Sequence, residues 1–269
     1  MPSNRALHED VDTPQIVEEA IADFYDRYGT YPLPPIVVVI AAYNEEPSLP
    51  TTLAEIPDEI EGLAVRALVI DDGSTDASAK VADEAGALVC SLSRNCGQGT
   101  ATRAGYQIVR ERHGKYIATV DADGQWAPAD LPPMVKLLEA DQADLVLGSR
   151  QLGRTENYDA VRNFGVRLFA RVISVLTGTK ITDSSSGLRC MRAEITGRVR
   201  QTQPQYQAAE FVIGTLCQGY RVAEVPAVMR VRHAGETKKG RNAFYGMRYA
   251  EVIVTTWLRE RRNRVRPRA

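Results

Sequence analysis

The strongest constraint on the fold is a regular alternation of short apolar runs with amphipathic segments, which begins at Ile36. The apolar runs are rich in β-branched residues, as buried strands are, and the segments between them have helical spacing. Strands are expected at residues 36–41, 66–70, 88–92, 116–120 and 144–147, and helices at 48–56, 77–85, 99–112 and 131–139. This order predicts an α/β protein with a mainly parallel central sheet flanked by helices.

The second half of the chain has a less regular pattern. Helices are expected at 161–176, 208–218 and 243–260, strands at 221–225 and 228–231, and a loop with a short strand at 180–191. We expect three parts: an N-terminal extension with one helix (1–34), the α/β domain (35–242), and a C-terminal amphipathic helix with a basic tail (243–269). The 269 residues suit one hydrophobic core with appendages.

Composition excludes several classes of protein. The net charge of -1 gives no general attraction to nucleic acid, and no run of about 18 apolar residues predicts a membrane-spanning helix. The four cysteines are widely spaced and the N-terminus has no signal-sequence pattern, so we expect a cytoplasmic protein with reduced thiols.

Polar clusters fall where the predicted strands end. In an open parallel sheet, ligands bind at the carboxyl ends of the strands, so these clusters are candidate site residues. They are Ala42-Tyr43-Asn44-Glu45, Asp71-Asp72, Asp121-x-Asp123 and Ser149-Arg150. An acid at a strand end, such as Asp71, can accept hydrogen bonds from a nucleobase edge or from ribose hydroxyls. Helix capping by Ser74 or Thr75 explains part of that motif but does not explain Asp71 or Asp72.

The segment after the fourth strand predicts a metal site. In an extended chain Asp121, Asp123 and Gln125 point the same way, so three oxygen-bearing side chains can converge. Such a set suits Mg²⁺ or Mn²⁺, which prefer oxygen ligands. The alternative is a solvated acidic turn, which is weakened here by the other matched signals.

Other nucleotide-binding and catalytic patterns are missing. The first strand-helix junction has neither G-x-G-x-x-G nor G-x-x-x-x-G-K-S/T. The three histidines show no partner pattern for a Ser-His-Asp triad or a zinc site.

Taken together, the motifs resemble family 2 glycosyltransferases with the GT-A fold, from about residue 36 to residue 239. The matching segments are Ala42-Tyr43-Asn44-Glu45, Val69-Ile70-Asp71-Asp72-Gly73-Ser74-Thr75-Asp76, Arg94-Asn95-x-Gly97-x-Gly99, Asp121-Ala122-Asp123-Gly124-Gln125, Gly148-Ser149-Arg150, Asp183-Ser184-Ser185-Ser186-Gly187 and Gly219-Tyr220-Arg221-Val222-x-Glu224-Val225-Pro226. Within the family, the chain is most similar to dolichol- and polyprenyl-phosphate sugar transferases. It departs from them at Trp126-Ala127-Pro128-Ala129-Asp130 and at Thr237.

The resemblance implies an inverting, metal-dependent transfer of a hexose from a nucleotide-diphosphate sugar, GDP-mannose or a UDP-sugar, to a polyprenyl or dolichyl phosphate. It implies a donor site made of Ala42, Tyr43, Glu45, Asp71, Asp72, Gly99, Asp121, Ala122 and Arg150. The ion, Mg²⁺ or Mn²⁺, would be held by Asp121, Asp123 and Gln125 and would act as a Lewis acid.

The resemblance also implies an acceptor site. A lipid phosphate is already ionised, so it needs cations for positioning more than it needs a base; the candidates are Arg162, Ser186, Arg232 and Lys238. Asp123 and Asp183 are the catalytic candidates. Asp183 acts either as a base or as an organiser of the site, with simple loop capping as the alternative.

Two other functions stay open. One is transfer to a soluble saccharide or other hydroxyl acceptor, and the other is a catalytically silent nucleotide-sugar-binding protein. The intact acids of the motifs argue against the silent protein, and neither the nucleobase nor the sugar follows from these residues.

The C-terminus suggests peripheral attachment to an anionic membrane, on its cytoplasmic face. The helix expected at 243–260 carries large apolar residues, including Phe244, Ile253 and Trp257, and basic residues follow: Arg259, Arg261, Arg262, Arg264, Arg266 and Arg268. An apolar helix face with a basic flank can lie in the headgroup region. The alternative is a helix packed on the core with a solvated tail.

Overall fold

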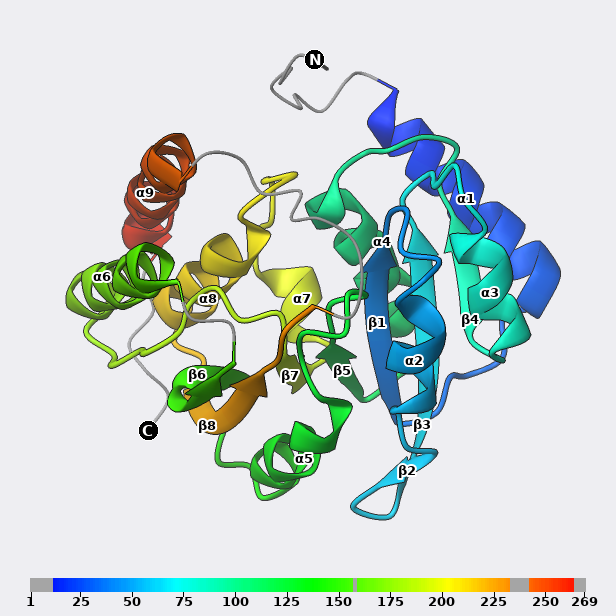
Figure 1. Cartoon of the computed structure of the whole chain (residues 1–269), viewed down its shortest axis with the longest axis horizontal. Coiled ribbons are helices and arrows are strands. Elements are labelled where there is room, and N and C mark those ends of the chain that lie inside the picture. The colour runs from blue at the N-terminus through cyan, green and yellow to red at the C-terminus, as the bar shows by residue number, and fades with distance from the viewer. Residues whose placement is uncertain (1–11, 157–158, 233–241, 264–269) are drawn as a thin grey trace.

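The computed structural model describes residues 12–156, 159–232 and 242–263. Its first half contains α1 (Thr13–Tyr28), β1 (Ile36–Ala42), α2 (Leu49–Ala54), β2 (Glu59–Ile60), β3 (Leu63–Asp71), α3 (Ser78–Glu84), β4 (Leu88–Ser91), α4 (Gln98–Glu111), β5 (Tyr116–Thr119) and α5 (Pro132–Glu139) (Figure 1). The second half contains β6 (Leu145–Thr155), α6 (Ala160–Thr177), β7 (Arg189–Arg192), α7 (Ile195–Arg198), α8 (Gln207–Cys217), β8 (Val222–Met229) and α9 (Asn242–Glu260).

These strands form one sheet in the order β3-β1-β5-β7-β6-β8, with β4 and the short β2 both paired to β3. The pairs β3/β4, β1/β3, β1/β5 and β6/β8 are parallel, whereas β7 runs antiparallel to both β5 and β6. The prediction of a mainly parallel sheet within an α/β fold is confirmed.

Strand β1 shows how the apolar runs create a core on each face of the sheet. Successive side chains of a strand point to opposite faces. Val37 and Val39 therefore join a core with α1, α4 and α8, whereas Ile36, Val38 and Ile40 join another with α2, α3 and α5. Because β1 is buried on both faces, its sequence is continuously apolar instead of alternating.

Helix α1 packs onto this domain through one apolar face. Ala20, Ile21 and Phe24 are buried and belong to the same core as β4 and α4, and Ile16 packs partly against it.

Strand β6 is much longer than predicted. The sequence suggested a strand that ends at residue 147 and is closed by Gly148-Ser149-Arg150, but these three residues lie inside β6. The reason is the partner strand β8, which pairs with β6 on both sides of an irregularity between Ser149 and Arg154.

Strand β8 is likewise continuous, although the sequence predicted two strands separated by Pro226. Proline has no N–H and is tolerated on an edge strand. Since β8 ends the sheet order, Pro226 can pair with Ser149 on one side without losing a bond on the other.

Helix α9 packs on the domain as the core-packing alternative requires. Ile253 is buried, and the indole Nε1 of Trp257 donates a 2.9 Å hydrogen bond to the carbonyl of Leu176 in α6. The Phe244 side chain and Arg264, Arg266 and Arg268 lie outside the described part of the chain. No helix among the described residues has the length and apolar character needed to cross a bilayer.

Candidate active site

The ends of β1 and β3 are tied together at the carboxyl edge of the sheet. Asp72 donates its N–H to the carbonyl of Ala42 at 2.8 Å. Asn44, which has a positive φ of 52°, accepts the N–H of Thr75 at 2.8 Å and donates its own N–H to Ser74 Oγ. The two predicted polar clusters therefore form one surface.

Asp71 and Asp72 differ in what they hold. Asp71 accepts the N–H of Ser74 at 3.1 Å, within its own turn. Asp72 accepts the N–H groups of Cys96 and Gly97 at 2.7 and 3.0 Å, and burial raises its pKa to about 6. Asp72 thus anchors the loop that leads into α4, an organising contact that the sequence did not reveal.

Two glycines of the motifs serve close backbone packing. A Cβ on Gly73, which has a positive φ of 71°, would lie 2.3 Å from the backbone carbon of Arg94. A Cβ on Gly99, one of the predicted donor-site residues, would lie 2.2 Å from the carbonyl oxygen of Gln203. Both positions therefore exclude a side chain, whatever ligand the site binds.

The acidic segment after β5 is a turn and not the extended chain on which the prediction rested. The strand ends at Thr119, and Gly124 has a positive φ of 72°. Alternating side-chain directions therefore do not explain how Asp121, Asp123 and Gln125 are placed. Gln125 is buried, and its carbonyl accepts the N–H of Arg230 beyond the end of β8 at 2.8 Å.

Asp121 faces two segments from elsewhere in the chain. Gln98, at the start of α4, donates to its carboxylate at 3.3 Å. A Cβ on Gly187 would lie 2.1 Å from the same carboxylate, so only glycine lets the 183–187 segment approach it. The two predicted motifs are therefore in direct contact.

Asp123 meets a cation at the same edge of the sheet. Arg232 lies 2.7 Å from the Asp123 carboxylate and 3.6 Å from that of Glu45. Burial and the adjacent Asp121 charge raise the pKa of Asp123 to about 6, against the opposing effect of Arg232. Sites predicted from β1, from the acidic turn and from the chain after β8 thus come together.

The two carboxylates of the acidic turn, Asp121 and Asp123, fit a hard divalent cation. Asp121 and Asp123 are close enough for one charge to raise the pKa of the other, and a cation relieves such repulsion. Among the described residues no cluster of three or more acidic, histidine or cysteine side chains could hold a metal ion. Two carboxylates leave coordination positions for ligand oxygens and water.

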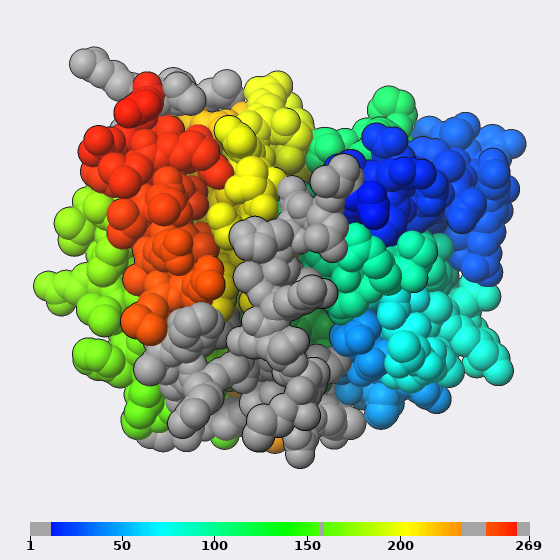
Figure 2. All heavy atoms as spheres, turned by 90° about the horizontal axis from the view of Figure 1, so that it is seen from above, coloured from blue at the N-terminus to red at the C-terminus, as the bar shows by residue number. Residues whose placement is uncertain are grey.

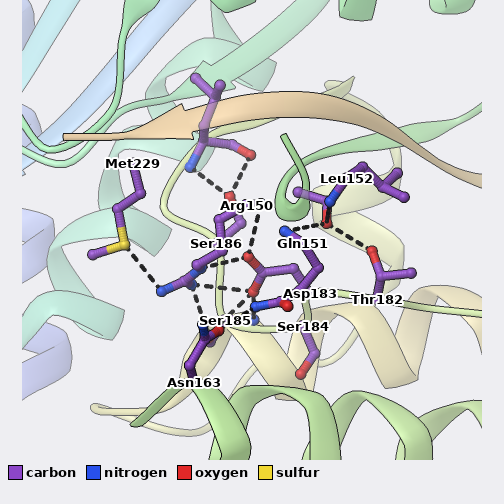
Figure 3. Close-up of polar contacts among 12 residues, drawn as sticks. Arg150, Gln151, Leu152, Asn163, Thr182, Asp183, Ser184, Ser185, Ser186 and Met229 are labelled. Atoms are coloured by element: carbon purple, nitrogen blue, oxygen red, sulfur yellow. Dashed lines mark hydrogen bonds and ion pairs between the residues drawn. The ribbon is translucent and has the colours of Figure 1, made fainter. Parts of the chain in front are cut away.

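Asp183 occupies a different environment, fully buried against Arg150 (Figure 3). Arg150 Nε and Nη2 contact the two carboxylate oxygens of Asp183 at 2.6 and 3.1 Å, and Nη2 also donates to Ser185 Oγ at 2.9 Å. The guanidinium lies over the Trp126 ring, 5.2 Å from its centroid. Arg150 and Asp183 are thus locked together, and the donor-site role predicted for Arg150 competes with this pair.

Glu224 fixes the segment that carries Asp183. Its carboxylate accepts the N–H and hydroxyl of Thr182 and the N–H of Asp183 at 2.9 to 3.0 Å. Burial raises the pKa of Glu224. No role was predicted for Glu224, although a carboxylate within the apolar strand β8 was a usable signal.

The remaining predicted residues have varied positions. Ser186 is buried, and its hydroxyl bonds the backbone of Leu188. Arg162 lies in the first turn of α6, and Lys238 lies outside the described residues. Ala42 and Ala122 are buried, and Tyr43 is half-buried beside Asn44. Trp126 and Gln98 contact predicted site residues but were not recognised from the sequence.

Comparison with known proteins shows which family the chain matches. The model of glycosyl transferase family 2 matches residues 37–200. A dolichyl-phosphate hexose transferase of Haloferax volcanii is 32% identical over 208 residues, covering 77% of this chain and 88% of the relative. An undecaprenyl-phosphate mannosyltransferase of Micrococcus luteus is 31% identical over 237 residues, covering 82% and 93%.

Solved structures confirm the fold. Glucosyl-3-phosphoglycerate synthase from Mycobacterium tuberculosis, crystallised with Mn²⁺, UDP-glucose and phosphoglyceric acid, superposes with a TM-score of 0.64. Its sequence is 19% identical, and the match covers 93% of this chain and 85% of the synthase. The chain therefore has the GT-A fold.

Proposed function

The chain belongs to glycosyl transferase family 2, and on that premise we propose that this glycosyltransferase moves a hexose from a nucleotide-diphosphate sugar to a polyprenyl or dolichyl phosphate. The observation that carries the proposal is the meeting of Glu45, Asp123 and Arg232 at the carboxyl edge of the sheet. The names of the relatives, which act on dolichyl and undecaprenyl phosphates, support the choice of acceptor.

The donor site proposed here follows the strand ends. Tyr43, Glu45 and Asp71 would contact the nucleoside, because they surround the junction of β1 with β3. Asp121 and Asp123, with Gln125, would hold Mg²⁺ or Mn²⁺. The bound ion would supply Lewis-acid neutralisation of the charge that develops on the leaving nucleoside diphosphate.

The proposed reaction is a single in-line displacement. An oxygen of the acceptor phosphate attacks the anomeric carbon as the bond to the nucleoside diphosphate breaks, so the configuration inverts. This oxygen is already ionised near neutral pH, and no residue has to remove a proton from it. Cations that position it, Arg162, Arg232 and Lys238, matter more than a base.

Asp183 fits a positioning role in this reaction. It is fully buried, and its carboxylate is engaged by Arg150 and by the N–H of Ser185. A base for a soluble hydroxyl acceptor would need contact with that hydroxyl. We therefore assign Asp183 to holding the 183–187 segment against Asp121.

A transfer assay with crossed panels tests the function. GDP- and UDP-sugars, each with Mn²⁺ or Mg²⁺, are offered with a short-chain water-soluble polyprenyl phosphate or with soluble saccharides. We expect transfer to the phosphate acceptor, its loss in EDTA and its recovery with added Mn²⁺. Transfer only to saccharides would overturn the proposed acceptor. If the protein neither turns over any donor nor is thermally stabilised by one, the assignment as an enzyme is overturned.

A further inference from the structure

Helix α6 exposes an apolar stripe on its outer face. The residues lie three and four positions apart, on one side of the helix. Its apolar members are between 46% and 77% exposed: Val161, Phe164, Leu168 and Val175. Arg171 takes the remaining position of the repeat.

The opposite face of α6 already forms the contact with the domain. Ala170, Ile173 and Thr177 are buried there. Phe169 packs on Tyr249 of α9 with ring centroids 4.9 Å apart. The exposed stripe is therefore surplus to the packing of the core. Figure 2 shows α6, in green, along the outer edge of the molecule beside α9, in orange and red.

Cations lie within the stripe and along one side of it. Arg167, Arg171 and Lys180 are exposed, and they line an open groove of about 760 Å³ beside the helix. Arg167 is held there because its Nε donates to Gln151 Oε1 at 2.7 Å. Helix α6 contains no acidic residue, and Asp159 precedes it as the N-cap. The face thus combines apolar side chains with positive charge.

One wall of the groove belongs to the chain that leads into the 183–187 segment. Thr182 lines it, and the next residue is Asp183, whose segment reaches Asp121. A surface that covered α6 and the groove would therefore lie next to the 183–187 segment.

We propose that the outer face of α6 docks on an anionic phospholipid bilayer, an inference that rests on the proposed lipid-phosphate acceptor. The apolar stripe lies among the upper acyl chains, and Arg167, Arg171 and Lys180 contact lipid phosphates. Charge complementarity selects this occupant. In a symmetric pairing of two copies through this face, the same cations would oppose one another.

This surface differs from the C-terminal attachment considered from the sequence. In α9, Ile253 is buried and Trp257 bonds α6, so neither is presented to a bilayer. Exposed apolar residues do remain on α9, and Glu251 is exposed among Met247, Val254 and Leu258. Arg248 lies 3.9 Å from the Glu251 carboxylate, so this acid and this cation offset each other, whereas the cations of α6 have no acid on their own helix.

Vesicle flotation of the full chain tests the proposal. The wild type should float with phosphatidylcholine vesicles only when they contain phosphatidylglycerol, and less at high salt. Arg171→Glu with Lys180→Glu should lower the partition coefficient by at least about 30-fold, since each lost cation removes about 1 kcal/mol. Phe164→Ser with Leu168→Ser should lower it by about tenfold through lost apolar insertion.

A matched pair on the neighbouring helix, Val254→Ser with Leu258→Ser, controls for the loss of exposed apolar area. It should float like the wild type, and all variants should keep the wild-type melting temperature. Three outcomes would overturn the assignment to α6: unchanged flotation of both α6 variants, an equal loss of flotation in the α9 pair, or a complete loss of flotation in a chain stopped after Glu260. So would concentration-dependent dimerisation that only the α6 variants abolish.

The transfer assay separates this inference from the proposed function. With the short-chain soluble acceptor and no vesicles, Phe164→Ser with Leu168→Ser should transfer sugar at the wild-type rate. If this variant transfers sugar normally and its flotation is unaltered, the docking face is contradicted and the proposed function is not. Lipid binding that depends on α6, without transfer to any prenyl phosphate, sinks the acceptor assignment alone.

Discussion

Two aspartate–arginine pairs border the candidate active site, and they are built differently. Asp183 and Arg150 form a two-point pair that is almost inaccessible to solvent, with Ser185 and Trp126 around it. Asp123 and Arg232 share one 2.7 Å contact, and Arg232 also faces Glu45. The first arrangement fixes a loop, whereas the second holds a carboxylate that is suited to bind an incoming cation. The same chemical pair therefore carries different roles according to the exposure of its arginine and its other partners.

The comparison is tested most strongly by Asp123→Ala. Transfer should fall by about a thousandfold or more, the equivalent of about 4 kcal/mol in the barrier, because the carboxylate pair that suits the metal is gone. The melting temperature should change little, since Arg232 keeps Glu45 as a partner. Initial rates with saturating Mn²⁺ measure the effect.

Asp83→Ala is the matched control, because Asp83 is an exposed aspartate paired with Arg27 on the surface between α1 and α3. It should keep the wild-type rate. Wild-type transfer by Asp123→Ala would remove Asp123 from the metal site.

Asp183→Asn should instead act mainly on stability. It leaves the buried Arg150 charge without its counter-ion, which costs about 3–5 kcal/mol and lowers the melting temperature by roughly 10 °C. Transfer should slow, while donor affinity should stay close to the wild-type value. Urea unfolding and nucleotide titration measure the two effects.

The double substitution Arg150→Met with Asp183→Leu serves as the control for the unpaired charge. It should recover part of the lost stability, because replacing both partners avoids a buried lone ion. If Asp183→Asn loses donor affinity in proportion to rate, Asp183 belongs to the donor site instead.

The two regions also differ in what sequence reasoning could reach. The apolar strands and the acids at their ends were predicted, because burial and strand periodicity are local properties. The length of β6 was not, since it depends on pairing with β8, far along the chain. The Arg150–Asp183 pair joins residues 33 positions apart, and Glu224 reaches Asp183 from 41 positions away. Such partners require the folded topology.

Acidification should affect the Asp123 region. Its pKa is raised to about 6, so the carboxylate is ionised above that pH and gains its proton as the pH falls through it. The protonated form cannot bind a cation well, and Mn²⁺ affinity should fall by up to about tenfold per pH unit below about 6. Titration calorimetry between pH 5 and 8, with Asp123→Ala as the reference, measures this. An Mn²⁺ affinity that does not change across that pH range would show that Asp123 is not a ligand.

The smallest expected effects come from removing one polar neighbour of each aspartate. One substitution should change only the stability, and the other should change only the Mn²⁺ affinity. The half-buried Ser185 accepts from the buried Arg150 through its Oγ, so Ser185→Ala should cost about 1 kcal/mol of stability by leaving a donor unsatisfied, with Mn²⁺ affinity unchanged. Gln98 Nε2 donates to the half-buried Asp121 at 3.3 Å, a weak bond that water can replace. Gln98→Ala should therefore leave the unfolding free energy unchanged and alter Mn²⁺ affinity, because the Asp121 carboxylate is freer to turn.

Urea unfolding and Mn²⁺ titration of both variants form a two-by-two comparison. Equal losses of stability in both variants would mean that the two aspartates are held in the same way, and the contrast between the two pairs would then fail.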